Sequence, residues 1–475
     1  MRRLLLLFSM VLIAGAMTAC DTFVSEVDTP KDSDPEETFT TPQDINFLAN
    51  GVKTQGANAT AFLAVTSGLL SDQFRFARNS DATFPTFAAP DQGLPTPLNT
   101  SVGDATRSLG EYRRLADNLL QAAERPEEYP PSAPITKQGA KFIGTFHGAI
   151  ARYYYATYVG LNPRDGGGVI NESAFIPSPA MYDSARVKFN RALALAPTAK
   201  DSANVRSAHA RSALYAGTQF GTNTSGYNDA LQRAAELASN GLKPGDAPFN
   251  AQFSVQEPNY WWDQAGPGRF QIVAMDDTLN GLVTGTHKDF SQIRSFPAVV
   301  AANPNERRRI PLAQKGWVDE NGQVRIEFGQ IKYALEDTPT PIISWEEVHL
   351  IRAELEMRGY STGSKSALAL VNEVRADGTL PGRGIDEITI TIIGSADATY
   401  TINRNEPFNL PALDNLDMER LAVERDRTLF GQGQRLPDQR RLDVVDWHLK
   451  ETVQGQQTWQ YLPLTSQERD NNPNL

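Results

Sequence analysis

The chain has 475 residues, a formal net charge of −11 and a single cysteine. This acidic balance argues against nucleic acid or an anionic lipid surface as the main partner, but it leaves open a neutral ligand such as a sugar. One cysteine cannot form an intramolecular disulfide, so a disulfide framework is excluded. The length suits one large domain or two of ordinary size.

The N-terminus has the pattern of a secretory signal peptide over residues 1–19. Two arginines precede an apolar run from Leu4 to Met17 that is too short to span a bilayer permanently. The letters MTAC at positions 17–20 resemble a bacterial lipobox, in which the cysteine thiol takes a diacylglyceryl group and the leader is cut before it. We expect lipidation of Cys20, with acyl chains such as palmitate anchoring the protein to a membrane. The alternative is an ordinary signal peptide followed by a chance cysteine.

Residues 20–42 are expected to hold the lipidated cysteine and a flexible acidic tether. The stretch DTFVSEVDTPKDSDPEETFTTP has seven acidic residues, one lysine and three prolines, and it has too little apolar surface to order itself. Its aspartates lack the glycine and glutamate spacing of a calcium loop, so no metal site is expected there. The remainder, residues 43–475, is expected to be a single domain.

Hydrophobic periodicity predicts that this domain is mainly α-helical. Thr41 and Pro42, followed by Asp44, are typical of a helix start, and residues 104–125 and 141–159 are predicted helices. Three further apolar stripes with three- and four-residue steps are Tyr182, Ala185, Phe189, Ala192 and Ala196; Val205, Ala208, Ser212 and Tyr215; and Tyr227, Ala230, Ala234 and Leu237. Because the stripes are rich in alanine, the backbones can approach closely. Successive helices of this kind predict tetratricopeptide-like helical hairpins.

A fourth hairpin is predicted over residues 341–378. Gly359 is expected to break its first helix, and Ser364 is expected to cap the second. Strand signals are local: residues 317–328 contain an Asn-Gly pair typical of a hairpin turn, and residues 386–402 alternate isoleucine with polar residues. The expected fold class is therefore mainly α, with small β-hairpin and loop excursions.

Several segments in order resemble the SusD/RagB family of outer-membrane nutrient-binding lipoproteins. VHLIRAELEMRGYSTGSKSALALVNEVRADG (348–378) resembles the family's late helical hairpin, and VERDRTLFGQGQRLPDQRRLD (423–443) is similar to its EERRRELAFEGHRFYDLRRW segment. ARYYYATYVGLNPRDGGG (151–168) resembles the family's tyrosine-rich helix and glycine turn. NPNERRRIPL (303–312) is similar to its Asp-Pro-Arg segment, and YLPLTSQERDNNPNL (461–475) resembles its closing FPIPQSEIDANPNL.

The resemblance implies a SusD-like fold whose C-terminus lies back over the domain, with Tyr461, Leu462 and Leu464 packed against it. It also implies a location at the cell outer membrane, facing the exterior, and a SusC-like TonB-dependent transporter as partner. The basic cluster from Arg420 to Arg441 is interpreted as ion pairs within the fold, with a ligand site as the alternative.

Catalytic motifs are missing from the sequence. It has no G-x-S-x-G elbow, no phosphate loop and no H-E-x-x-H, and its five histidines are scattered. We expect no catalytic residue, no cofactor and no metal. A glycosidase pair of carboxylates stays open as an alternative, because tertiary geometry alone sets such a pair.

Aromatic and basic residues in two predicted loops are the candidates for ligand binding, because exposed rings with polar neighbours suit the apolar faces and hydroxyls of sugars. The loops are EPNYWWDQAGPGRF (257–270) and SDQFRFARNSDATF (71–84). The candidates are Tyr260, Trp261, Trp262, Phe74, Arg75 and Arg78. The alternative for each is core packing, and we expect at least one of the two tryptophans to be a ligand platform.

The sequence thus predicts a lipid-anchored outer-membrane solute-binding protein that captures an oligosaccharide or similar nutrient and delivers it to the transporter without a covalent step. One alternative is a tetratricopeptide-type scaffold lipoprotein for protein assembly. Another is an α-helical, lipid-anchored glycoside hydrolase.

Overall fold

The computed structural model describes most of the chain from Thr41 onward. The described residues are 41–71, 73–76, 85–224, 226–265, 272–274, 312–318, 324–330, 332–377, 387–391, 399–403, 410–442, 452–453 and 455–475. The predicted signal peptide, the predicted tether up to residue 40, Cys20 and Arg78 lie outside them, as do residues 303–311 of the Asp-Pro-Arg-like segment. Among the described residues, no helix is long and apolar enough to cross a membrane.

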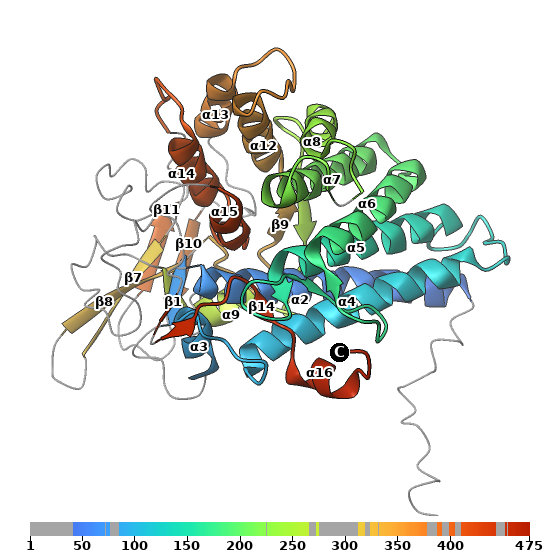
Figure 1. Ribbon diagram of the computed structural model, residues 1–475, viewed down its shortest axis with the longest axis horizontal. Helices are drawn as coiled ribbons and strands as arrows, with labels where there is room; N and C mark the ends of the chain where they lie inside the picture. Colours follow the sequence, from blue (N-terminus) through green and yellow to red (C-terminus); the bar gives the residue numbers. More distant parts are fainter. Residues whose placement is uncertain are drawn as a thin grey trace, which may run out of the picture.

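Three long helices, α2 (Pro42–Leu70), α4 (Thr100–Glu124) and α5 (Lys137–Tyr158), pack against one another (Figure 1). Helix α2 begins where the sequence predicted it. The Asp44 amide donates to the Thr41 hydroxyl, and the Thr41 amide donates to the Asp44 carboxylate. Helices α4 and α5 approach closely at Gly144, where a Cβ atom would lie 2.8 Å from the Ala116 carbonyl oxygen.

Five more helices continue the array, each in contact with the next: α6 (Ser178–Leu195), α7 (Ala199–Phe220), α8 (Ala230–Ser239), α12 (Trp345–Met357) and α13 (Ala367–Ala376). The predicted stripes are buried in this array, apart from Ala196, which is the half-buried C-cap of α6. The mainly α fold class is confirmed.

Two helix starts differ from the prediction. Helix α8 begins only at Ala230, because the Asp229 carboxylate accepts a hydrogen bond from the Gln232 amide and thereby caps the helix there. Tyr227 therefore precedes the helix, although its ring is buried. Ser366, and not Ser364, caps α13, because its hydroxyl accepts from the Ala369 amide.

The described strands form small two-stranded pairs. They are β1 (Phe74–Phe76) with β6 (Ile272–Ala274), β3 (Gly167–Gly168) with β4 (Ile176–Pro177), β5 (Phe249–Ala251) with β9 (Thr340–Ile343), β7 (Leu312–Val318) with β8 (Val324–Gln330), β10 (Glu387–Thr391) with β11 (Thr399–Asn403), β12 (Thr452–Val453) with β13 (Gln456–Gln457), and the parallel pair β2 (Val159–Gly160) with β14 (Leu462–Pro463).

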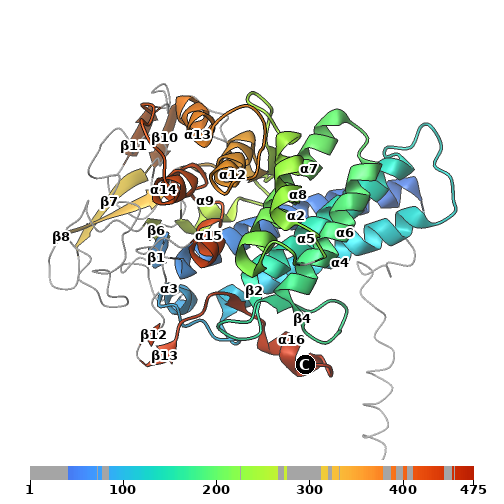
Figure 2. The ribbon, with the colours of Figure 1, turned by 45° about the horizontal axis from the view of Figure 1, so that its top comes forward.

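Two of these pairs confirm the strands that the sequence predicted over residues 317–328 and 386–402. In β7–β8, Val318 pairs with Val324, and in β10–β11, Ile390 pairs with Tyr400. The predicted turn residues between their strands lie outside the described part of the chain. Figures 1 and 2 show these two pairs on the side of the molecule away from helices α4 to α6.

Between β1 and α4 the described chain contains the 3-10 turn η2 (Pro85–Phe87) and the short helix α3 (Ala88–Asp91). After the β10–β11 pair come α14 (Met418–Thr428) and α15 (Arg435–Arg441). Helix α14 packs against α12, and α15 packs against α2 and α7. Helices α14 and α15 therefore contact both α2 and the middle of the helical array.

The last residues lie back over the helices, as the resemblance implied. Tyr461, Leu462 and Leu464 are 2%, 0% and 1% exposed. The Arg440 guanidinium lies 4.2 Å from the centre of the Tyr461 ring, and Gln219 donates to the Tyr461 hydroxyl. A last short helix, α16 (Ser466–Asn471), follows.

Candidate functional site

The segment that carries the two adjacent tryptophans is a short helix, α9 (Tyr260–Ala265), and not the loop that we predicted. Asn259 fixes its start from contacts that are distant in sequence. The Asn259 side chain donates to the Thr338 carbonyl oxygen at 2.6 Å, and its own oxygen accepts from the Trp261 amide at 2.9 Å. The tertiary contact thus supplies the helix cap that the sequence did not reveal.

Trp261 and Phe74 lie in the interior. For these two residues the alternative to ligand binding, packing in the core, is therefore what the structure shows. Each is 0% exposed, and their ring centres are 4.7 Å apart. Phe74 also packs on Phe430 at 4.9 Å, and Trp261 stacks on Tyr333 at 6.2 Å. This cluster joins β1, α9 and the segments near residues 333 and 430 into a second hydrophobic core beside the main helical one.

The other described candidates, Tyr260, Trp262 and Arg75, are half-buried. We call these three residues together with the half-buried Phe76 the α9–β1 face. The Tyr260 ring centre lies 4.1 Å from that of Phe62, so Tyr260 packs on helix α2. The two predicted loops, distant in sequence, are therefore brought together through the Phe74–Trp261 contact, and Figures 1 and 2 show β1 beside α9.

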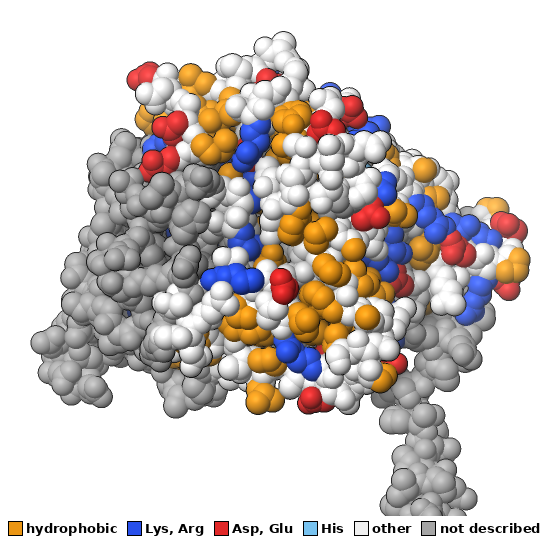
Figure 3. All heavy atoms as spheres, viewed as in Figure 1, with side chains coloured by type: hydrophobic (Ala, Val, Ile, Leu, Met, Phe, Trp, Pro, Cys, Tyr) orange, Lys and Arg blue, Asp and Glu red, His pale blue; other side chains and the backbone are white. Residues whose placement is uncertain are grey.

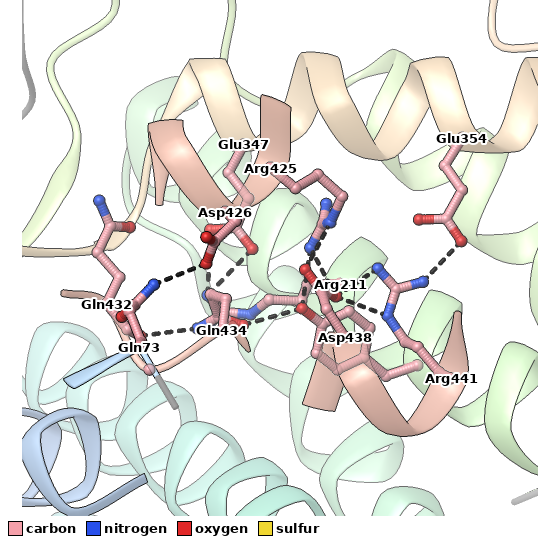
Figure 4. A network of polar contacts seen from close by, with 12 residues as sticks. Gln73, Arg211, Glu347, Glu354, Arg425, Asp426, Gln432, Gln434, Asp438 and Arg441 are labelled. Atoms are coloured by element: carbon pink, nitrogen blue, oxygen red, sulfur yellow. Dashed lines mark hydrogen bonds and ion pairs between the residues drawn. The ribbon is translucent and has the colours of Figure 1, made fainter. Parts of the chain in front are cut away.

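The basic cluster on α14 and α15 forms buried ion pairs, as we interpreted it (Figure 4). Arg425 pairs with Asp438 at 2.8 Å, and Arg435 pairs with Asp426 at 2.8 Å. Arg441 bridges Asp438 on its own helix and Glu354 on α12, each at 2.6 Å.

Helix α7 adds a further pair to this network. Arg211 lies 3.2 Å from Glu347 of α12, and its guanidinium also donates to the Ile342 carbonyl oxygen at 2.7 Å. The network therefore ties the C-terminal helices to the helical array. Removing one partner would leave an uncompensated buried charge, which typically costs about 3–5 kcal/mol.

The carboxylates of this network respond differently to burial. Burial opposes ionisation of Glu354, but Arg441 and Arg358 outweigh it and lower its pKa to about 2. At Glu347 burial outweighs the attraction of Arg211, and the pKa is raised. These buried ion pairs tie the C-terminal helices to the helical array, so the cluster has a structural role.

The surface of the helical array carries charges of both signs. Figure 3 shows Lys and Arg side chains interspersed with Asp and Glu on the helices at its right side. Asp117 on α4, for example, pairs with Arg152 and with Lys188, each at 2.9 Å. In the described part of the chain, no group of His, Cys, Asp and Glu side chains is arranged to hold a metal ion.

Sequence reasoning missed the partners that surround the candidate residues. Phe62 and Tyr333 carried no motif, and Phe430 lay in the 423–443 segment without being singled out; they meet α9 or β1 only in the folded chain. The ion-pair network did have a signal, the basic cluster from Arg420 to Arg441, but its buried partners on α12, Glu347 and Glu354, were not singled out.

The fold is a mainly α-helical array with small two-stranded pairs between and beside its helices. No protein-family model matches the sequence, and no curated protein matches it.

Solved structures do match. A SusD superfamily protein from Bacteroides thetaiotaomicron VPI-5482 is 13% identical, with a TM-score of 0.56 over 91% of this chain and 98% of that one. Surface glycan-binding protein A from Bacteroides uniformis is 12% identical, with a TM-score of 0.52 over 89% and 98% of the two chains. A structure described with xylogluco-oligosaccharide is 13% identical, with a TM-score of 0.52 over 84% and 83%. The chain therefore has the SusD-like fold.

Proposed function

We propose that this protein is a SusD/RagB-type solute-binding lipoprotein of the cell outer membrane that captures an oligosaccharide or a similar nutrient. The observation that carries the proposal is the SusD-like fold along nearly the whole chain. Two of the similar structures are described as a surface glycan-binding protein and as a structure with xylogluco-oligosaccharide, which supports a carbohydrate as the ligand class.

The lipobox-like letters around Cys20 and the acidic stretch 21–42 support a lipid anchor followed by a tether, with residues 43–475 as one binding domain. A chain of this tether length spans roughly 25 Å when flexible. The domain would then sit close to the membrane, facing the exterior, and would deliver its ligand to a SusC-like TonB-dependent transporter without chemical conversion.

The α9–β1 face is the proposed ligand-binding site. Tyr260 and Trp262 would stack on sugar rings, while Arg75 and Arg78 would bind hydroxyl groups. Trp261 and Phe74 lie behind this face and hold it in place through their ring contact. A rigid support matters because preorganised contacts lose less entropy when the ligand binds.

The test uses soluble protein consisting of residues 21–475. A glycan array identifies the ligand, and titration calorimetry then compares the wild type with Trp262→Ala. We expect a defined glycan class and weaker binding in the variant. Release of sugar fragments during incubation would instead favour the glycoside hydrolase. Failure to bind any glycan, together with capture of a stable protein complex, would favour the scaffold lipoprotein.

The transporter partnership needs a separate measurement in cells. The full chain carrying an affinity tag should copurify with a TonB-dependent outer-membrane transporter after mild detergent extraction. Recovery of the chain without such a transporter would argue against delivery, while leaving glycan capture intact.

A further inference from the structure

Three buried polar side chains meet beneath α9 without using their polar atoms. Trp261 and Tyr333 are 0% exposed, and Gln432 is 5% exposed. The Trp261 indole nitrogen, the Tyr333 hydroxyl and both amide atoms of Gln432 make no hydrogen bond to any residue that the structure describes. Buried polar groups nearly always have a hydrogen-bond partner, so a cluster of unpaired ones needs an explanation.

Gly431 shows that the three residues converge. A Cβ at this glycine would lie 2.9 Å from Tyr333 Cε2 and 3.7 Å from Trp261 Cε2. These two carbons neighbour the carbon that bears the tyrosine hydroxyl and the indole nitrogen, respectively. Gly431 has a φ of +72°, so glycine suits the site on both steric and conformational grounds. Both rings therefore contact the turn that carries Gln432.

Gln432 completes the cluster from the other side. Figure 4 shows its amide pointing away from the ion-pair network, with no interaction drawn to it. Burial raises the pKa of the Tyr333 phenol, and a hydrogen-bonding contact with the Gln432 side chain opposes this shift, which places the amide next to the hydroxyl. The contact does not reach the distance and angle of a full hydrogen bond, so both groups keep hydrogen-bonding capacity.

The surrounding polar groups are already paired. Gln330 accepts from the Tyr333 amide at 2.9 Å and donates to the Trp261 carbonyl oxygen at 3.2 Å. Gln434 accepts from the Tyr215 hydroxyl at 2.9 Å and donates to the Gln432 carbonyl oxygen at 3.1 Å. The side chains of Gln330 and Gln434 are thus paired, unlike those of Trp261, Tyr333 and Gln432 among the residues that the structure describes.

We propose that Trp261, Tyr333 and Gln432 form a buried binding site for a hydroxyl group, either that of an internal water or that of a saccharide. A hydroxyl both donates and accepts hydrogen bonds, and these three side chains together can also do both. The indole N–H and the Gln432 amide nitrogen donate to the ligand oxygen, and the Gln432 amide oxygen accepts its proton. The three side chains are all uncharged, which matches a neutral ligand.

The two sources of the hydroxyl share this chemistry. Water fits any roomy, polar, buried position with two to four partners. A saccharide hydroxyl would arrive from the α9–β1 face, since Trp261 is adjacent to Trp262 on α9. The inference does not rest on the proposed function, because water fills the site equally well.

The test combines Gln432→Met with a matched control, Gln434→Met. Both glutamines are buried and two residues apart, but only Gln434 has its amide hydrogen-bonded within the protein. We expect both variants of the soluble protein to lower Tm, by about 2 °C or more. If the Gln432 amide binds nothing, methionine replaces an unpaired buried amide by an apolar group, and Tm should stay equal or rise. That result would overturn the proposal.

Crystals of the wild-type soluble protein, grown without sugar and then soaked in D-glucose, separate the sources. An ordered oxygen among the three side chains in the sugar-free crystals identifies water. An oxygen that appears only as part of bound glucose identifies a saccharide hydroxyl. Both outcomes support the site, whereas no ordered oxygen in either crystal would overturn it even if Gln432→Met had lowered Tm.

Discussion

Replacing each of the two adjacent tryptophans by alanine should have opposite consequences. Trp261 is 0% exposed and packs on Phe74 and Tyr333, so Trp261→Ala leaves a cavity between α9 and β1. Removing a large buried aromatic typically costs about 3–5 kcal/mol of folding free energy. For a chain of this size that corresponds to a Tm decrease of roughly 3–5 °C.

Trp262 is half-buried, so its loss should affect folding much less. If it stacks on a sugar, Trp262→Ala should weaken glycan binding by about 1–3 kcal/mol, as hot-spot aromatics do. The assays are a thermal melt for Tm and titration calorimetry with the glycan from the array, applied to both variants and to the wild type.

The two variants serve as controls for each other. A Trp261→Ala protein that melts like the wild type would contradict the burial of Trp261. A Trp262→Ala protein that binds normally would show that Trp262 is no ligand platform, and the segment from Phe74 to Arg78 would become the next candidate.

Three further changes test other parts of the argument. Cys20→Ala should give folded protein that no longer fractionates with the membrane, and continued membrane association in cells lacking the transporter would refute the anchor. Deletion of residues 461–475 should lower Tm, since each buried apolar side chain contributes roughly 1.5–3 kcal/mol; an unchanged melt would show that the terminus contributes nothing. Burial lowers the pKa of His147 and His209 to about 3, whereas an unfolded histidine titrates near 6.5. The unfolded state then binds more protons, so stability should fall as pH drops from about 6.5 toward 3, by about 1.4 kcal/mol per pH unit for each. Urea titrations at pH 7 and 5 measure this, with His209→Phe expected to remove about half of the dependence from these two groups; equal stability of the wild type at both pH values would refute it.

The buried ion pairs show how much of the structure could be predicted from residue types alone. The sequence marked the Arg420–Arg441 segment as ion pairs within the fold, and this is confirmed. It did not identify the partners, because Arg211, Glu347 and Glu354 come from α7 and α12. Charges pair through space, and helix packing alone decides which ones meet.

The sequence by itself determined the local structure of this protein. The capping box at Thr41 and the alanine-rich stripes depend on residues three or four apart, whose contact is fixed by the helix itself. Whether residues 260–265 form a loop or a helix depended instead on Asn259 reaching Thr338. The burial of Trp261 beside a half-buried Trp262 likewise depended on Phe74 and Tyr333. Such contacts join segments far apart in the chain, so only tertiary packing decided which tryptophan supports the fold and which one can face a ligand.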